Sequence, residues 1–335
     1  MRTRPKLCLF ILAGLVFRTG ASGHQLSFRV YGGLGYSSGG DLNRSIAGWK
    51  SYYQGRQGGG FSSSYDLGEM HGAAELGAEA VLTLSRRWSL SLGVGYVRQS
   101  TSGEITTGTT RSEVVAVEPD ELWTVDFERT TRQNPAYTRT AVPITLSLDY
   151  LLAGRGRWTL RLGAGGGFYP GRLTLQESYE LTSETISDLE TANGAIRFID
   201  RLSTSGDYTE KTKNSAFGLH GRVGLEIELG ASSFLTVSVL GRWVEMKGWK
   251  GNRHDVSSWD WTTGLWGANS TAGTDERTEE GQYWVSVLKD EKSGASYPVL
   301  VFRDSAPSSS SRPANISLSG FSVRLGFGFR FGGKS

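Results

Sequence analysis

Eight segments of the chain alternate large apolar residues with small or charged ones. In the last of them, Val323, Leu325 and Phe327 lie on one face of an extended chain, and Arg324 and Gly326 lie on the other. A period of two residues is typical of β-strands that have one apolar face. Each segment is close to the roughly 9–11 residues that a tilted strand needs to cross a bilayer. The pattern therefore predicts eight strands, over 26–36, 74–84, 88–97, 140–151, 158–168, 217–229, 233–244 and 321–331.

The connections between these segments are alternately short and long. The short ones are 85–87, 153–157 and 230–232, and the long ones are 37–73, 98–139, 169–216 and 245–320. Transmembrane barrels have short turns on the periplasmic side and longer loops outside the cell. The sequence thus predicts an all-β fold, a transmembrane antiparallel up-and-down β-barrel of eight strands with both termini in the periplasm. The alternatives are a soluble all-β protein and a ten-stranded barrel, in which segment 282–304 also crosses the membrane.

Aromatic residues stand near both ends of the predicted strands. Rings at both membrane boundaries are typical of barrels that face lipid. We expect one girdle at the periplasmic side, formed by Trp88, Trp158 and Phe234. The other girdle, at the outer side, is formed by Tyr36, Tyr96, Phe168, Tyr169 and Trp243.

The first 23 residues have the features of a secretory signal peptide. A basic start precedes a short apolar run, and small residues at 21–23 suit signal peptidase. Residues 24–335 then form a single domain without cysteine, because Cys8 is the only cysteine of the chain. Removing four basic residues from 36 leaves 32, against 33 acidic ones, so the mature chain offers no support for nucleic-acid binding. No later stretch is apolar for long enough to form a transmembrane helix.

The final strand carries a further pattern, in which a polar residue and a glycine precede two aromatic residues. These positions are Arg324, Gly326, Phe329 and Phe331. With this pattern and the strand layout, the chain resembles the small bacterial outer-membrane barrels of the OmpA/OmpX type, within the broad outer-membrane β-barrel family. The resemblance implies an assembly signal read by the barrel-assembly machinery, and contact with outer-membrane lipid and lipopolysaccharide. It departs from the family in the four residues 332–335, which follow the last aromatic residue.

The inward faces of the predicted strands carry charge. Eight strands enclose a lumen that side chains roughly fill, and buried charges without partners are costly. We therefore expect the inward set to pair into a network that seals the lumen; a gated narrow pore for ions or small solutes is the alternative. The set holds six arginines and five acids: Arg29, Glu75, Glu79, Asp149, Arg161, Arg222, Glu226, Glu228, Arg242, Arg324 and Arg330. Inward glycines should make room for these side chains.

Little in the sequence indicates catalysis. His220 is predicted to point inward beside Arg222, and the other histidines stand in no recognisable triad spacing. The resemblance leaves a lipid-modifying outer-membrane enzyme as a second alternative, because some barrels of this size have that activity. No metal-binding motif is present. We predict a protein that is not an enzyme and has no catalytic site, metal or cofactor.

The long loops are where function is expected. Segment 55–68 is predicted to be a flexible Gly/Ser-rich loop. Two hairpins are predicted, one over 113–129 that turns at Pro119 and Asp120 and one over 282–304. Segments 172–181 and 195–202 are predicted to extend the neighbouring strands beyond the membrane. Five loop tryptophans form either an apolar core over the barrel mouth or a surface for an extracellular glycan, lipid or protein ligand. They are Trp249, Trp259, Trp261, Trp266 and Trp284. The predicted role is structural, or surface interaction and adhesion through these loops.

Overall fold

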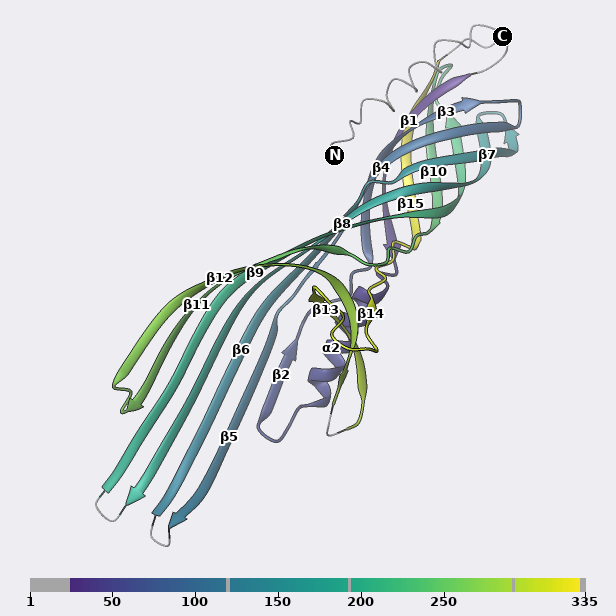
Figure 1. Ribbon diagram of the computed structural model, residues 1–335. Helices are drawn as coiled ribbons and strands as arrows, with labels where there is room; N and C mark the ends of the chain where they lie inside the picture. The colour runs from purple at the N-terminus through teal and green to yellow at the C-terminus, as the bar shows by residue number, and fades with distance from the viewer. Residues whose placement is uncertain (1–24, 119–120, 192–193, 291–292, 332–335) are drawn as a thin grey trace.

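The protein is described by a computed structural model over residues 25–118, 121–191, 194–290 and 293–331. The predicted signal peptide, the turn residues Pro119 and Asp120 and the tail 332–335 lie outside the described residues. The chain is almost entirely antiparallel strand. Figure 1 shows a barrel of curved strands and, beyond it, a long sheet that carries the helix and two shorter strands beside it.

All eight predicted segments contain a strand, and these strands pair in chain order. Each strand is hydrogen-bonded to the next, and the last pairs again with the first, with Val30 opposite Phe327. The strands are β1 (Leu26–Ser37), β3 (Gly72–Thr83), β4 (Trp88–Ser102), β7 (Ile144–Arg155), β8 (Trp158–Thr191), β9 (Gly194–Glu228), β10 (Ser233–Trp243) and β15 (Gly320–Phe331).

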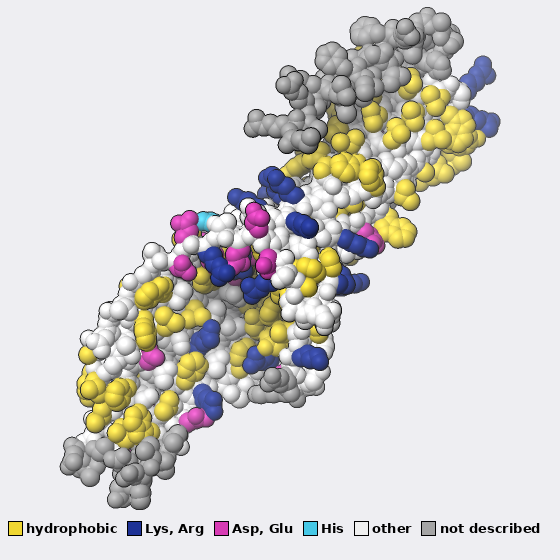
Figure 2. Space-filling view, viewed as in Figure 1, with side chains coloured by type: hydrophobic (Ala, Val, Ile, Leu, Met, Phe, Trp, Pro, Cys, Tyr) yellow, Lys and Arg dark blue, Asp and Glu magenta, His cyan; other side chains and the backbone are white. Residues whose placement is uncertain are grey.

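The outer face of the barrel is apolar. Leu34 is 74 % exposed and Phe217 is 84 % exposed. Hydrophobic side chains spread over the barrel in Figure 2, whereas charged side chains gather in a band across the middle of the molecule. Most of the predicted girdle residues are exposed, but Phe234 and Tyr169 are buried. Phe234 follows the alternation of β10 inward, since its neighbour Leu235 occupies the outward position.

The long loops are folded into what we call the projecting sheet. It consists of the distal parts of β8 and β9 together with six further strands, in the order β13-β12-β11-β9-β8-β6-β5-β2. The extensions of β8 and β9 and both hairpins are confirmed. The added strands are β2 (Phe61–Tyr65), β5 (Ile105–Glu118), β6 (Glu121–Ala141), β11 (Lys250–Leu265), β12 (Asn269–Lys289) and β13 (Ser296–Arg303).

The predicted strand 140–151 is two strands. β6 ends at Ala141 and β7 begins at Ile144, with Pro143 between them. Proline has no N–H to give to a ladder, so the pairing is interrupted there. The two strands nevertheless lie end to end beside the same neighbour, because β4 pairs with β7 up to Val94 and with β6 from Val97 onward.

The helix α2 (Asp41–Gly55) was not predicted, and β2 lies within the segment expected to be a flexible loop. Leu42 and Ile46 lie one turn apart and are buried. Asp41 fixes the start of the helix, because it accepts hydrogen bonds from Arg312 of β14 (Arg312–Pro313) at 2.7 and 2.8 Å. Over the described ranges, no helix is long and apolar enough to span a membrane.

An apolar core lies where the barrel meets the projecting sheet. It joins α2 to residues from the barrel rim and from the last connection, including Leu173, Trp249 and Ile316, each of them fully buried. Backbone hydrogen bonds from Ile316 to Met246 and from Leu318 to Val244 tie the two ends of that connection together. The core therefore covers the mouth of the barrel.

Candidate functional site

The lumen holds a network of ion pairs. Its centre is Arg222, on β9, which donates to Asp149 Oδ1 at 2.7 Å, to Glu79 Oε2 at 2.6 Å and to Ser91 Oγ at 2.8 Å. Ser91 in turn donates to Asp149 at 2.5 Å. Arginine suits this place because its planar fork satisfies several acceptors at once.

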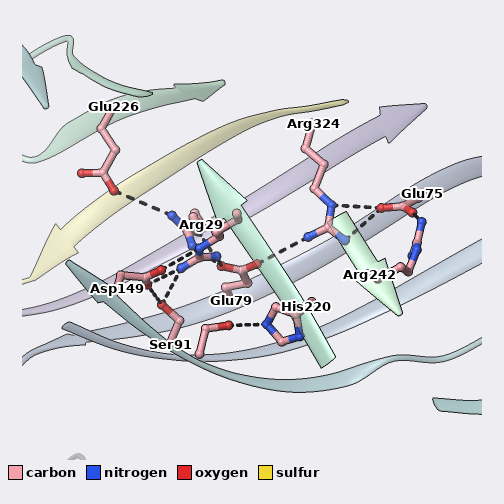
Figure 3. A network of polar contacts seen from close by, with 11 residues as sticks. Arg29, Glu75, Glu79, Ser91, Asp149, His220, Glu226, Arg242 and Arg324 are labelled. Carbon is pink, nitrogen blue, oxygen red and sulfur yellow. Dashed lines mark hydrogen bonds and ion pairs between the residues drawn. The ribbon is translucent and has the colours of Figure 1, made fainter. Parts of the chain in front are cut away.

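A second group lies nearer the mouth. Glu75 accepts a hydrogen bond from Arg324 at 2.9 Å and another from Arg242. Arg324 also lies 3.8 Å from Glu79 and 4.4 Å from the centre of the Tyr31 ring. Glu79 thus joins this group to the one around Arg222. Figure 3 shows Glu79 between Arg324 on one side and Asp149 and Ser91 on the other.

A third group lies toward the short turns. Arg29 donates to Glu79 at 2.7 Å and lies 3.7 Å from Glu226. Glu226 also pairs with Arg161 at 3.2 Å and Arg330 at 3.6 Å. Arg330 bonds Glu228 at 2.5 Å. All eleven charged residues predicted to face the lumen therefore belong to one connected network.

Glycines give this network its space. A Cβ at position 93 would lie 3.0 Å from Cγ of Glu79, and one at position 163 would lie 3.0 Å from Cγ of Arg222 and overlap Asp149. Side chains at these two positions would displace the charged groups, so glycine here serves close approach between neighbouring strands.

The mouth of the lumen holds a buried cation that the sequence analysis did not single out. Arg139, 1 % exposed, donates to Ser317 O at 2.6 Å, to Ser37 Oγ at 2.9 Å and to Gln99. Burial lowers the pKa of Arg139 to about 9. Its hydrogen bonds to described residues all go to neutral acceptors, so this arginine closes the mouth without joining the ion-pair network.

The histidines form no common site in the described part of the chain. His220 Nε2 lies 2.6 Å from Ser147 Oγ, and its Nδ1 has no hydrogen-bond partner among described residues. His71 contacts Glu69, and His254 contacts Thr278. His24 lies outside the described residues. Over the described ranges, no group of three or more His, Cys, Asp or Glu residues could hold a metal ion.

The five loop tryptophans do not share one surface. Trp249 is fully buried in the core at the barrel mouth and donates to Met246 O at 3.1 Å, so its assignment to a ligand surface is wrong. Trp261 and Trp266 are 43 % and 66 % exposed. Trp259 and Trp284 are half-buried. The exposed rings lie on β11 and just beyond its end, far from the core.

A cavity of about 250 Å³ lies between α2 and the projecting sheet, where sequence reasoning expected no site. Two buried glutamates line it. Glu177 accepts a hydrogen bond from Tyr208 at 2.6 Å, and Glu210 accepts one from Tyr283. Burial raises the pKa of both carboxyl groups, although these hydrogen bonds oppose the shift.

Comparisons with known proteins give structural neighbours only. No family model matches the chain, and no curated protein matches it. OprG of Pseudomonas aeruginosa, an outer-membrane protein, is 12 % identical, with 93 % of this chain and 98 % of that chain covered and a TM-score of 0.35. CarO of Acinetobacter baumannii is 11 % identical, with coverages of 81 % and 95 % and a TM-score of 0.20. The outer membrane protease OmpT of Escherichia coli is 11 % identical, with coverages of 92 % and 96 % and a TM-score of 0.27. Similarity this low carries no argument about function.

Proposed function

We propose that the chain is a closed, eight-stranded barrel of the bacterial outer membrane, with a sealed lumen, that presents the projecting sheet at the cell surface. It resembles the OmpA/OmpX type in its barrel and differs in the size of this sheet. Its role is structural, or surface interaction and adhesion, and it is not an enzyme.

The outer face of the barrel supports the membrane location. Its exposed apolar side chains would be unfavourable in water at about 25 cal/mol per Å² of apolar surface, and lipid removes that cost. Pairing of each strand with two neighbours also satisfies the backbone, which lipid cannot do. Short turns at one end and the projecting sheet at the other favour a periplasmic and an outer side, respectively.

Two further partners follow from this location. The apolar face would contact outer-membrane lipid and lipopolysaccharide. Phe329 and Phe331 are exposed on the outer face of β15, and together with Arg324 and Gly326 they would provide the signal for the barrel-assembly machinery.

The proposal of a sealed lumen rests on the ion-pair network. Its charges lie in one chain of contacts, and an ion passing through would have to break several of them. Arg139 and the apolar core close the mouth above. The Ser147–His220 pair is buried in the same lumen, which gives a lipid substrate no route to it and disfavours the enzyme alternative.

Conductance in planar bilayers tests the sealed lumen. We expect no stable opening by the folded protein at neutral pH. The triple variant Arg222→Ala, Arg242→Ala and Arg324→Ala should admit ions if the barrel stays folded, as judged by its altered migration in detergent gels without heating. Stable opening by the unchanged protein would refute the sealed lumen and favour the narrow pore.

A further inference from the structure

The cavity beside α2 is bounded by two different parts of the fold. One wall is the middle of the projecting sheet, through β6, β8, β9, β11 and β12, and the other is α2 together with the two edge strands of that sheet, β2 and β13. Its volume of about 250 Å³ is below the roughly 300–1,000 Å³ of sites for drug-sized ligands. A small ligand is therefore the appropriate occupant.

The charge of the cavity is not balanced by the protein. Glu177 and Glu210 are 8 % and 3 % exposed. Arg253 lies 3.7 Å from Glu210 and 3.8 Å from Asp255, so two carboxylates share one guanidinium. Among described residues, no basic group forms an ion pair with Glu177. Burial raises the pKa of this carboxyl, and neither the Tyr208 hydrogen bond nor the charge of Arg253, which both lower it, offsets the shift.

Aromatic rings surround these carboxylates. Tyr53 packs against Trp49 and Tyr65, with ring centres 5.6 and 6.1 Å apart. The Arg253 guanidinium already lies 4.2 Å from the centre of the Tyr208 ring, which shows that this environment accommodates positive charge. Ring faces attract cations, most strongly where water is excluded.

Three tyrosine hydroxyls of the cavity are unused. Those of Tyr53, Tyr65 and Tyr137 make no hydrogen bond with any residue that the structure describes, although all three side chains line the cavity. These side chains are half-buried, so their hydroxyls are open to hydrogen bonds from water or from a ligand. A ligand with a hydroxyl or amino group would satisfy them.

We propose that this cavity binds a small organic ammonium ion. The ion supplies the missing counter-charge to Glu177, its C–H groups contact the rings of Tyr53 and Tyr65, and a polar substituent reaches the free hydroxyls. The inference deepens the proposed surface-binding role and rests on it for access from outside the cell.

Calorimetry on the full chain in detergent tests the site with two probes of nearly equal shape. Choline carries the charge, and 3,3-dimethylbutan-1-ol is its neutral carbon analogue. We expect choline to bind at one site per chain, at least about tenfold more tightly than the alcohol, because a buried ion pair distinguishes them. Tetramethylammonium and methylammonium extend the series to ions without a hydroxyl.

The variant Glu177→Gln should lower the affinity for choline about tenfold or more and leave the alcohol unaffected. Glu184→Gln is the matched control, because Glu184 lies on the same strand but pairs with Arg201 outside the cavity. Both variants must keep the gel migration of the folded barrel. Equal affinity for choline and the alcohol, unchanged choline binding by Glu177→Gln, or no binding of any of the three ions would overturn the proposal. These outcomes leave the sealed lumen untouched, since conductance tests it separately.

Discussion

Replacing Arg222 by methionine is the sharpest test of the lumen network. Methionine has a similar length and no charge, so the substitution removes the interactions without opening a large void. Glu79 would keep its contact with Arg29, whereas Asp149 would keep only the hydroxyl of Ser91. The barrel would then hold a buried carboxylate without a cation.

The magnitude follows from that uncompensated charge. Breaking a buried pair by removing one partner typically costs about 3–5 kcal/mol, and we expect Arg222→Met to lower the free energy of unfolding by this amount. Adding Asp149→Asn removes the uncompensated charge and should recover about 0.5–3 kcal/mol, the usual coupling between residues in contact. Arg201→Met is the matched control. Arg201 is 58 % exposed in its pair with Glu184, and exposed pairs contribute about 0–1 kcal/mol.

The assay is equilibrium unfolding in urea with the barrel in lipid vesicles, followed by tryptophan fluorescence. The change should appear in the midpoint and not in the slope, because the surface exposed on unfolding is the same. A loss below about 1 kcal/mol for Arg222→Met, or a double variant less stable than the single one, would refute the account of the lumen as a mutually dependent charge network.

Further predictions concern the projecting sheet and the barrel. Burial raises the pKa of Glu177 and Glu210, so the folded state keeps these protons to a higher pH than the unfolded chain, whose glutamates titrate near about 4.3. The stabilisation that these two buried carboxyl groups provide should therefore be complete below that value and should be lost as pH rises through the raised pKa values. Urea midpoints measured across pH should show this decrease. In Glu177→Gln the midpoint should depend less on pH. Trp249→Ala should cost about 3–5 kcal/mol, measured by the same unfolding, while Trp266→Ala, at an exposed ring, should have little effect. Gly163→Ala should lower the urea midpoint, because its Cβ would meet the Asp149 carboxylate; an unchanged midpoint would argue against close packing there. Unheated and heated protein should migrate differently in detergent gels, and identical migration would argue against a stable barrel.

The barrel strands could be predicted because both of their faces are specified. An outward apolar residue next to an inward polar one imposes a strict period of two, as in Leu325 and Arg324. In the projecting sheet the faces are less distinct. Segment 203–209 is polar at nearly every position, so the sequence there carries no alternation, although β9 continues through it without interruption.

The helix was missed, and the tryptophan that enters the core over the barrel mouth could not be told from the exposed ones, for other reasons. Leu42, Ile46 and Trp49 have helical spacing, but the Gly/Ser-rich sequence that follows favoured an irregular loop. Trp249 and Trp261 both stand directly between polar or glycine residues, so their immediate neighbours do not distinguish them. Trp249 is buried only because residues 244–249 pack beside residues 314–318, an arrangement that no local pattern encodes.

The cavity depends on a register that the sequence alone does not state. Glu177 is opposite Tyr208, and Leu175 is opposite Glu210, because β8 and β9 form one hairpin whose last pair is Thr191 and Gly194. Once the position of that turn is known, the pairings of all facing residues follow from it. The turn was the missing information, although the sequence does contain a hairpin signal there, the dipeptide Asn193-Gly194, which was not singled out.

The uninterrupted β8–β9 hairpin also limits how this protein can change in length. A single residue inserted between Tyr169 and Leu173 would turn every later side chain of β8 to the opposite face. Glu177 would then point away from α2, while the lumen residues before the insertion would keep their places. Insertions and deletions at this junction should therefore be tolerated only in even numbers or where a bulge absorbs the odd residue. The barrel and the projecting sheet therefore cannot change in length independently at this junction, because β8 runs through both and its alternation of side-chain faces must suit both.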